Sequence, residues 1–290
     1  MNVVWCAEHM SFYSNLERAF LYTSILTWKH FYPEHTTNLY CDIQSRDIIA
    51  GMGIIDLWDN VNTEVLSKKE HTFDKTAFWA SSKLKVISEL KAPFAIIDLD
   101  LFIKQKFIPD EYWQQDVVGN FMEMTKHHYI EPYKIRKYMD LPDYEWDDKA
   151  INVAFLYINN EELRQKYAQI ALEWMDTMTK KGGVINGLNM VFCEQKLLWQ
   201  LIKHHNLKHK FLFNETLICY RDQWEENGLG LFRHEDQYDY AAHFGPDKRR
   251  AFDDSNGYYV ECKQNVLEVF FKLFPHLSIK VLNLLETGYV

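Results

Sequence analysis

Short apolar runs alternate with amphipathic stretches along the first hundred residues. The runs 2–6 and 37–42 have the length and residue types of strands, and the stretch 16–31 between them keeps its apolar residues on one helical face. A second helix is expected at 78–90, directly before the apolar run 94–97. Strand, helix and strand at this spacing predict βαβ units, and therefore a mostly parallel sheet with right-handed crossovers.

The rest of the chain has further periodic stretches around one long irregular segment. Residues 127–149 mix rings, basic groups and acids without periodicity, which predicts a long excursion over the surface. The final stretch, 260–285, is amphipathic and broken by Pro275; because its charges are few and mixed, we expect a helical pair packed on the sheet rather than a membrane-surface helix. The other expected elements are helices at 45–50, 161–179 and 189–204, and strands at 54–58, 151–159 and within 210–220.

A chain of 290 residues can bury most of its apolar surface in one large domain or two small ones. We expect a single domain, with a nucleotide-binding half at 1–100, a sugar and acceptor half at 101–250 and a helical tail at 251–290. The predicted fold class is therefore α/β and Rossmann-like, with a mostly parallel sheet flanked by helices and a helical C-terminal tail.

Composition and charge exclude several classes of protein. A net charge of −9 without a strong basic run argues against nucleic-acid binding, which needs a basic surface to displace counterions from phosphates. The five cysteines are widely spaced and form no C-x-x-C pair, a pattern typical of reduced, intracellular proteins. No run approaches the roughly 18 apolar residues that cross a bilayer, and the first residues do not look like a leader. We therefore expect no transmembrane segment and a cytoplasmic location.

The apolar run 94–97 ends in two carboxylates, Asp98 and Asp100. If the extended conformation continues, both side chains point to one side of the sheet, where their repulsion is best relieved by Mg²⁺ or Mn²⁺. Ligands of open α/β sheets also bind outside the carboxyl ends of the strands. Asp-x-Asp also occurs by chance, and an acid at a strand end can simply cap a helix or a turn. Because glycine-rich phosphate loops are missing, a nucleotide would be held by metal and side chains.

Four separate pieces of the chain occur in an order that resembles the nucleotide-sugar glycosyltransferases of the GT-A fold, nearest to the glycogenin and galactosyltransferase-like group. The apolar strand ending in Asp98-Leu-Asp100 comes first. The later pieces are Ile151-Asn-Val-Ala-Phe-Leu-Tyr-Ile-Asn159, the pair Glu194-Gln195 and Ala241-Ala-His-Phe-Gly-Pro-Asp-Lys248. Only the first matches cleanly, since the segment at Asn152 lacks the family's glycine and Glu194 stands where the family has an aspartate.

The resemblance implies a metal-dependent transferase that moves a hexose from a nucleoside diphosphate sugar, as a UDP-sugar, to a hydroxyl acceptor on a glycan, lipid or protein. It implies that Asp98 and Asp100 hold Mn²⁺, or Mg²⁺, on the diphosphate. Asn152 would line the sugar pocket, and Glu194 and Gln195 would lie beside the sugar. From the residues alone, Asn152 can equally bridge a turn and Glu194 can be a solvated helix residue.

Two groups of residues are candidates for the remaining donor contacts. Cys6 and Asp42 end the first two strands and can offer backbone and carboxylate contacts to uridine. Lys83 shares a helical face with apolar residues, so it either extends past packing to solvent or reaches a phosphate or sugar.

The late segment around His243 is the candidate for closing the metal site. Two alanines precede His243, and Gly245-Pro246 turns the chain, which lets the backbone approach a ligand closely. With the resemblance, His243 is a nitrogen ligand that favours Mn²⁺, Lys248 adds positive charge on the diphosphate and Gly245 donates its N–H to a phosphate oxygen. Without it, His243 is one loop histidine among twelve.

Other classes of protein remain alternatives. A haloacid dehalogenase-type phosphatase also places Asp-x-Asp at a strand end, but Phe102 stands at a position that takes Thr or Val there, and the strand is not the first. A nucleotidyltransferase binds a nucleoside triphosphate on a similar sheet, and a non-catalytic relative would bind a nucleotide sugar without turning it over. Inversion at the anomeric carbon would need a carboxylate base such as Glu194 or an acid within 140–148, whereas retention would not.

Overall fold

The computed structural model forms two compact units, each built from separate stretches of the chain. The first unit comprises Met1–Glu64, Ile97–Phe107 and Gly228–Val290, and the second comprises Val65–Ile96 and Ile108–Asn227. The single domain predicted from the sequence, with divisions at 100 and 250, stays a prediction. The described residues are 1–68, 73, 77–124, 132–138, 140–182, 188–213, 216–218, 241–243 and 257–289; among these, the side chains of 124, 188, 216–218, 241–243, 257–259 and 261 are not described.

The first unit contains a parallel sheet that begins at the N-terminus. β1 (Asn2–Ala7) pairs in parallel with β2 (Thr36–Cys41), and β2 pairs in parallel with the short β3 (Asn60–Asn62). Between them, α1 (Asn15–Phe31) starts at a capping box in which Ser14 and Glu17 satisfy each other's backbone N–H groups. Helix α2 (Ile43–Gly51) follows β2. The predicted strand, helix, strand unit is confirmed, with bounds shifted by about one residue.

Two small hydroxyl side chains on α1 fix the strand that follows the acid pair. Ser24 Oγ accepts a hydrogen bond from Trp5 Nε1 at 2.9 Å and donates one to the carbonyl oxygen of Leu101 at 2.6 Å. Thr27 Oγ1 accepts from the N–H of Ile103 at 3.3 Å. These bonds satisfy buried backbone groups of β5 (Leu101–Ile103), so they hold the residue directly after Asp100 against the core of the first unit.

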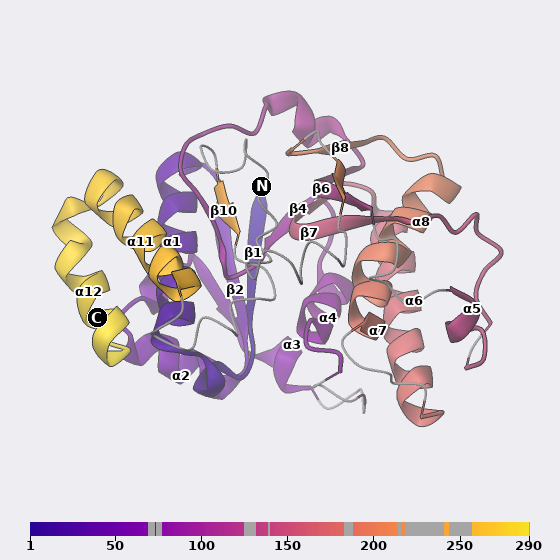
Figure 1. The fold of residues 1–290 in the computed structure, drawn as a ribbon, viewed down its shortest axis with the longest axis horizontal. Coiled ribbons are helices and arrows are strands. Elements are labelled where there is room, and N and C mark those ends of the chain that lie inside the picture. Colours follow the sequence, from indigo (N-terminus) through magenta and orange to yellow (C-terminus); the bar gives the residue numbers. More distant parts are fainter. Residues whose placement is uncertain are drawn as a thin grey trace. The chain divides into compact units, whose positions relative to one another are not determined.

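The C-terminal part is a helical hairpin that packs on the first unit. α11 (Gly257–Leu273) and α12 (Ser278–Thr287) are joined by the 3-10 turn Pro275–Leu277, and both contact α1 (Figure 1). Pro275 ends α11 because it cannot continue the helical hydrogen-bond pattern. The predicted pair of helices is confirmed, and its main packing partner is α1 rather than the sheet. None of the described helices combines the length and hydropathy that a membrane crossing requires.

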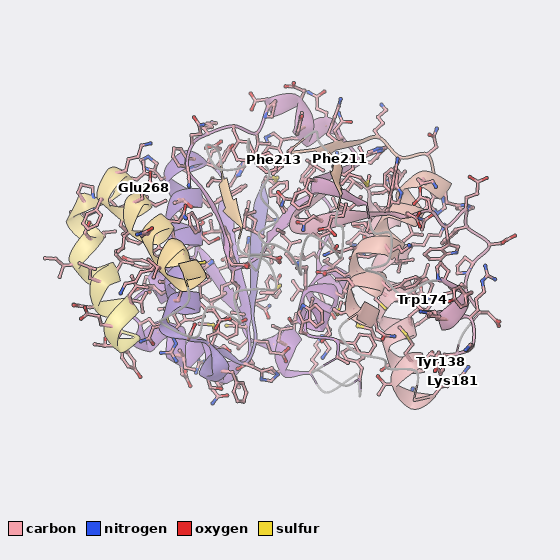
Figure 2. All side chains as sticks on the ribbon, viewed as in Figure 1. Tyr138, Trp174, Lys181, Phe211, Phe213 and Glu268 are labelled. Atoms are coloured by element: carbon pink, nitrogen blue, oxygen red, sulfur yellow. The ribbon has the colours of Figure 1, made fainter. Side chains whose placement is uncertain are left out.

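The second unit has a mixed sheet in the order β4, β7, β6, β8. β6 (Val117–Met124) runs antiparallel to β7 (Lys149–Ile158) and parallel to β8 (His209–Phe211) and β9 (Thr216–Ile218). The register of β6 on β7 shifts between Gly119 and Phe121. A Cβ on Gly119 would lie 2.4 Å from Ile151 Cγ2 and 3.4 Å from the ring of Phe211, which is labelled in Figure 2, so this close approach needs glycine.

Helices flank this sheet in the second unit. Those that pack on one another or on β7 are α4 (Ser81–Glu89), α6 (Glu161–Lys180) and α8 (Leu197–His204). α6 is followed by Gly182 at φ +66°, where glycine is favoured. Lys181, the residue before Gly182, donates from its Nζ to the carbonyl oxygen of Tyr138 at 2.6 Å. Both residues are labelled in Figure 2. The described residues also include three short helices, α3 (Glu64–Ser67), α5 (Pro132–Ile135) and α7 (Leu188–Val191).

The predicted fold class is confirmed: the protein is α/β and Rossmann-like, its strands are mostly parallel and flanked by helices, and its C-terminal part is helical. One predicted strand is wrong. Residues 54–58 form a 3-10 turn at Ile55–Leu57, and the strand of that region comes later, at Asn60–Asn62. β6 was not predicted, because Gly119 and Asn120 interrupt its apolar pattern.

A buried histidine makes the stability of the first unit depend on pH. Burial, assisted by the positive N-terminus, lowers the pKa of His35 to about 4, and its ring stacks on Tyr32 with 5.4 Å between centroids. The unfolded chain binds this proton near pH 6.5, so it holds more protons than the folded chain between pH 6.5 and 4, and stability is lost as the pH falls through that window. We expect His35→Phe to remove about 2 kcal/mol of the loss in unfolding free energy between pH 8 and pH 5. Urea denaturation at both pH values measures this, and equal pH dependence in the two proteins would contradict it.

Candidate functional site

The acid pair lies on a turn in the first unit rather than on a continuing strand. β4 (Phe94–Ile97) ends directly before Asp98, and the N–H of Leu101 donates to the Asp98 carbonyl oxygen at 3.1 Å, which closes the turn. The chain therefore does not stay extended from Asp98 to Asp100, and the condition under which both side chains would point to one side of the sheet is not met. Asp98 is half-buried, while Asp100 is only 4% exposed. Burial of an ionised carboxylate is costly unless a positive charge or donors compensate it.

A distant segment of the chain returns to this turn. β10 (Ala241–His243) pairs antiparallel with β5, and His243 is the Cα partner of Leu101, the residue that follows Asp100. The pairing thus brings the backbone of the predicted metal ligand next to the acid pair across about 140 residues of sequence. Gly245 and Lys248, the other candidates of that segment, lie outside the described residues.

The ends of β1 and β2 carry the two candidates for uridine contacts. Cys6 is half-buried and pairs with Tyr40 in the parallel register. Asp42 caps α2: its carboxylate accepts from the N–H of His9 at 2.8 Å, and from the N–H and hydroxyl of Ser45 at 2.8 and 2.9 Å. Burial alone would raise the pKa of Asp42, but these hydrogen bonds outweigh it and hold the pKa below its usual value. Asp42 therefore anchors the loop after β1, and its contact with uridine stays a prediction.

The second unit holds a buried ion pair between two predicted site residues. Lys83 Nζ lies 2.8 Å from Glu194 Oε1, and the two side chains are 9% and 5% exposed. Lys83 also donates to the carbonyl oxygen of Val153 at 3.3 Å. Glu194 and the half-buried Gln195 lie on a π-helical turn, Phe192–Lys196, inserted between α7 and α8. The solvent-exposed alternative is therefore wrong for both residues: Lys83 does not extend to solvent, and Glu194 is not a solvated helix residue. Their contacts with a phosphate or a sugar stay predictions.

Asn152 belongs to a buried polar network beside that ion pair. Its Nδ2 donates to Glu123 Oε1 at 2.8 Å, and its Oδ1 accepts from Asn120 Nδ2 at 3.0 Å and from the N–H of Ala154 at 3.1 Å. Asn120 and Glu123 were missed in the sequence analysis. Both are polar residues in the otherwise apolar strand β6, and this contrast would have pointed to them. It can be used only after β6 itself has been recognised as a strand.

A second carboxylate in this unit has a structural role. Asp147 accepts hydrogen bonds from Lys203 Nζ at 2.9 Å, the Lys149 N–H at 3.1 Å, Trp199 Nε1 at 3.1 Å and Gln200 Nε2 at 3.2 Å. Burial would raise its pKa, but these donors outweigh burial and hold the pKa below the usual value. Such a carboxylate is a weak base, so among the acids of 140–148 Asp147 fastens the irregular segment to α8 instead of taking up a proton.

The donor set near the acid turn fits a divalent cation chemically. Two carboxylates and one imidazole are oxygen and nitrogen ligands that suit Mn²⁺. Among the side chains that the structure describes, no three of His, Cys, Asp or Glu are grouped as a metal site, and the side chain of His243 is not one of them. Mn²⁺ or Mg²⁺ as the cofactor is therefore a proposal, taken up below.

Together these features define an α/β protein with an acid turn directly after the buried strand β4, and with a buried lysine–glutamate pair in the second unit. The chain belongs to the family described as Family of unknown function (DUF6734), whose model matches residues 5–253. That match includes every predicted site residue. No curated protein matches the sequence.

Several solved structures are similar in chain layout. Mouse xyloside xylosyltransferase 1 is 12% identical, with 85% of this chain and 99% of that chain covered at a TM-score of 0.41. The galactosyltransferase LgtC, in complex with donor and acceptor sugar analogs, is 12% identical, with 92% and 95% covered at 0.44. A nucleoside-diphosphate-sugar pyrophosphorylase from Vibrio cholerae RC9 is 10% identical, with 74% and 93% covered at 0.43. At these identities and TM-scores, the likenesses carry no information about activity.

Proposed function

We propose that this protein is a metal-dependent glycosyltransferase that moves a hexose from a UDP-sugar to a hydroxyl acceptor. The observation that carries the proposal is the pairing of β10 with β5, which places the backbone of His243 beside the residue that follows Asp98-Leu-Asp100. The backbone of His243 thus lies near the turn that carries Asp98 and Asp100, although these segments are far apart in the sequence. This position suits a metal–diphosphate complex in an α/β fold.

The residues of the first unit would bind and orient the donor. Asp100 would coordinate Mn²⁺ or Mg²⁺ directly, with Asp98 on the ribose or on metal-bound water, His243 as the nitrogen ligand, and Lys248 and Gly245 on the diphosphate. When bound, the ion offsets the negative charge that gathers on the diphosphate as the bond to the sugar breaks. Cys6 and Asp42 would hold the uridine at the ends of β1 and β2.

The resemblance assigns the sugar contacts to Asn152, Glu194 and Gln195. Gln195 offers a carboxamide group, which can both donate to and accept from sugar hydroxyls. Asn152 Oδ1 already accepts two hydrogen bonds and its Nδ2 donates one, so Asn152 would contribute its second Nδ2–H to the sugar. Lys83 holds Glu194 in one place through their ion pair, so Glu194 has a fixed position from which to act on a sugar hydroxyl or on the acceptor proton. The hydroxyl acceptor itself, on a glycan, lipid or protein, is part of the proposal.

A panel of nucleotide sugars tests the proposal. Purified protein with Mn²⁺ is expected to release UDP slowly from at least one UDP-sugar by hydrolysis, and faster once a suitable acceptor is added. Mixtures of a sugar phosphate with a nucleoside triphosphate serve as the comparison. Release of pyrophosphate from those mixtures, without turnover of any nucleotide sugar, would instead identify a nucleotidyltransferase. UDP-sugar binding without turnover would identify a non-catalytic relative.

The assignment of His243 makes a separate prediction. His243→Ala is expected to weaken activation by Mn²⁺ about 10-fold or more, as loss of a metal-site group commonly does, with a smaller change for Mg²⁺, which prefers oxygen ligands. Activity measured across a titration of each metal checks this. His209, on β8 of the second unit, is the control, and His209→Ala should leave both titrations unchanged. Full Mn²⁺ activation of His243→Ala would contradict the assignment.

A further inference from the structure

The bend of the C-terminal hairpin exposes large apolar side chains. Phe271, on the last turn of α11, is 58% exposed, and Ile279, on the first turn of α12, is 73% exposed. The opposite faces of the same helices are buried, with Phe270 and Val281 both at 0% exposure. The hairpin already packs on α1 through those buried faces. Phe271 and Ile279 are therefore not needed for the packing of the hairpin itself.

The charge around the bend differs from that of the whole chain. Residues 269–285 contain Lys272, His276 and Lys280 and no aspartate or glutamate, in a chain whose net charge is −9. Both lysines and His276 are exposed. The nearest carboxylate before the segment is Glu268, labelled on α11 in Figure 2. Glu268 is itself exposed and lies one helical turn before Lys272, so the basic, apolar patch is confined to the bend from Phe271 to Lys280.

We propose that the bend from Phe271 to Lys280 docks the protein reversibly on an anionic lipid surface. Phe271 and Ile279 would enter the boundary between headgroups and acyl chains, and Lys272 and Lys280 would contact the lipid phosphates. Long lysine side chains can lay their apolar stems along the membrane while the ammonium group stays at the headgroups. The packed hairpin holds these side chains in place before binding, which lowers the entropic cost of docking.

A lipid surface fits the patch better than a second copy of the chain. A two-fold contact centred on the bend would bring the lysines of the two copies close together, and like charges at short range repel. An anionic bilayer instead offers apolar depth for the two side chains and negative charge for the two lysines. This inference does not depend on the proposed glycosyl transfer, so either can fail alone.

Sedimentation of the full chain with vesicles tests the inference. We expect binding to vesicles of phosphatidylglycerol and phosphatidylcholine, and little binding to vesicles of phosphatidylcholine alone. The double variant Phe271→Ser, Ile279→Ser should lower the partition coefficient at least about 10-fold, because two large apolar groups are no longer transferred from water. Lys272→Gln and Lys280→Gln should each lower it about 5-fold. Added salt should weaken binding of the wild-type protein.

Val260→Ser provides the matched control. Val260 is also an exposed apolar residue of α11, 44% exposed, but it lies on the first turn, away from the bend. Its replacement should leave vesicle binding unchanged. Absence of binding to anionic vesicles, or equal loss in the control and the double variant, would overturn the inference. Concentration-dependent dimers that disappear in the double variant, without vesicle binding, would assign the patch to a second copy and also overturn it.

Discussion

Replacing Lys83 by Met is expected to lower the free energy of unfolding by about 3–5 kcal/mol, because it leaves the carboxylate of Glu194 buried without its cation. The two charged groups lie 2.8 Å apart and are almost fully buried, so solvent cannot take the place of the missing partner. The double variant Lys83→Met, Glu194→Gln should recover at least half of the loss, since it buries no uncompensated charge. Urea denaturation of the wild type, both single variants and the double variant gives the coupling energy directly.

The same unit supplies a matched control for this measurement. Lys68 and Glu89 form an ion pair of 3.3 Å in which both side chains are 44% exposed. Lys68→Met should therefore cost less than about 1 kcal/mol, because water screens and replaces the interaction. Equal losses for Lys68→Met and Lys83→Met would show that the buried pair is not energetically distinct, and would contradict the account of Lys83 as the group that holds Glu194.

Replacing Asp100 by Asn is expected to weaken Mn²⁺-dependent binding of UDP at least about 100-fold. The substitution keeps the size of the side chain but removes the charge that a hard cation requires, at the most buried acid of the turn. Asp98→Asn should have a smaller effect if Asp98 contacts ribose or metal-bound water rather than the ion. Calorimetric titration of UDP with and without Mn²⁺ measures both.

Asp47→Asn controls for a general effect of removing negative charge from the first unit. Asp47 lies on α2, is 62% exposed and pairs with Arg46 at 2.6 Å, so no ligand role is assigned to it. UDP affinity of this variant should equal that of the wild type. Unchanged affinity in Asp100→Asn, with the far-ultraviolet circular dichroism of the wild type, would remove Asp100 from the site.

Much of the fold could be predicted from the sequence where the local pattern and the packing agree. β1, α1, β2 and β4 follow from apolar runs and one amphipathic face, and α6 has clear ends at Asn160, which caps it, and at Gly182. β6 could not be predicted in this way. Its glycine is required by the close approach of Ile151, a long-range contact that leaves no periodic pattern in the sequence.

The candidate site was predicted as residue types but not as geometry. Asp98 and Asp100 would share one side of the sheet only if the strand continued. The chain instead turns between them, and β5, which follows, is hydrogen-bonded to Ser24 and Thr27 of α1, two long-range contacts that no local pattern indicates. The pairing of Lys83 with Glu194 depends on a π-helical turn, which has no simple sequence pattern. Asn120 and Glu123 contact Asn152 because of the register of β6 on β7, which the sequence does not specify.

A crystal structure of the protein with UDP and Mn²⁺, with the metal located by its anomalous scattering, tests the central claim most directly. The account predicts a manganese peak within coordination distance of a carboxylate oxygen of Asp100, with the UDP diphosphate on the same ion and the imidazole of His243 among its ligands. UDP bound elsewhere, or bound at the ends of β1 and β2 with no metal at Asp98 and Asp100, would contradict it.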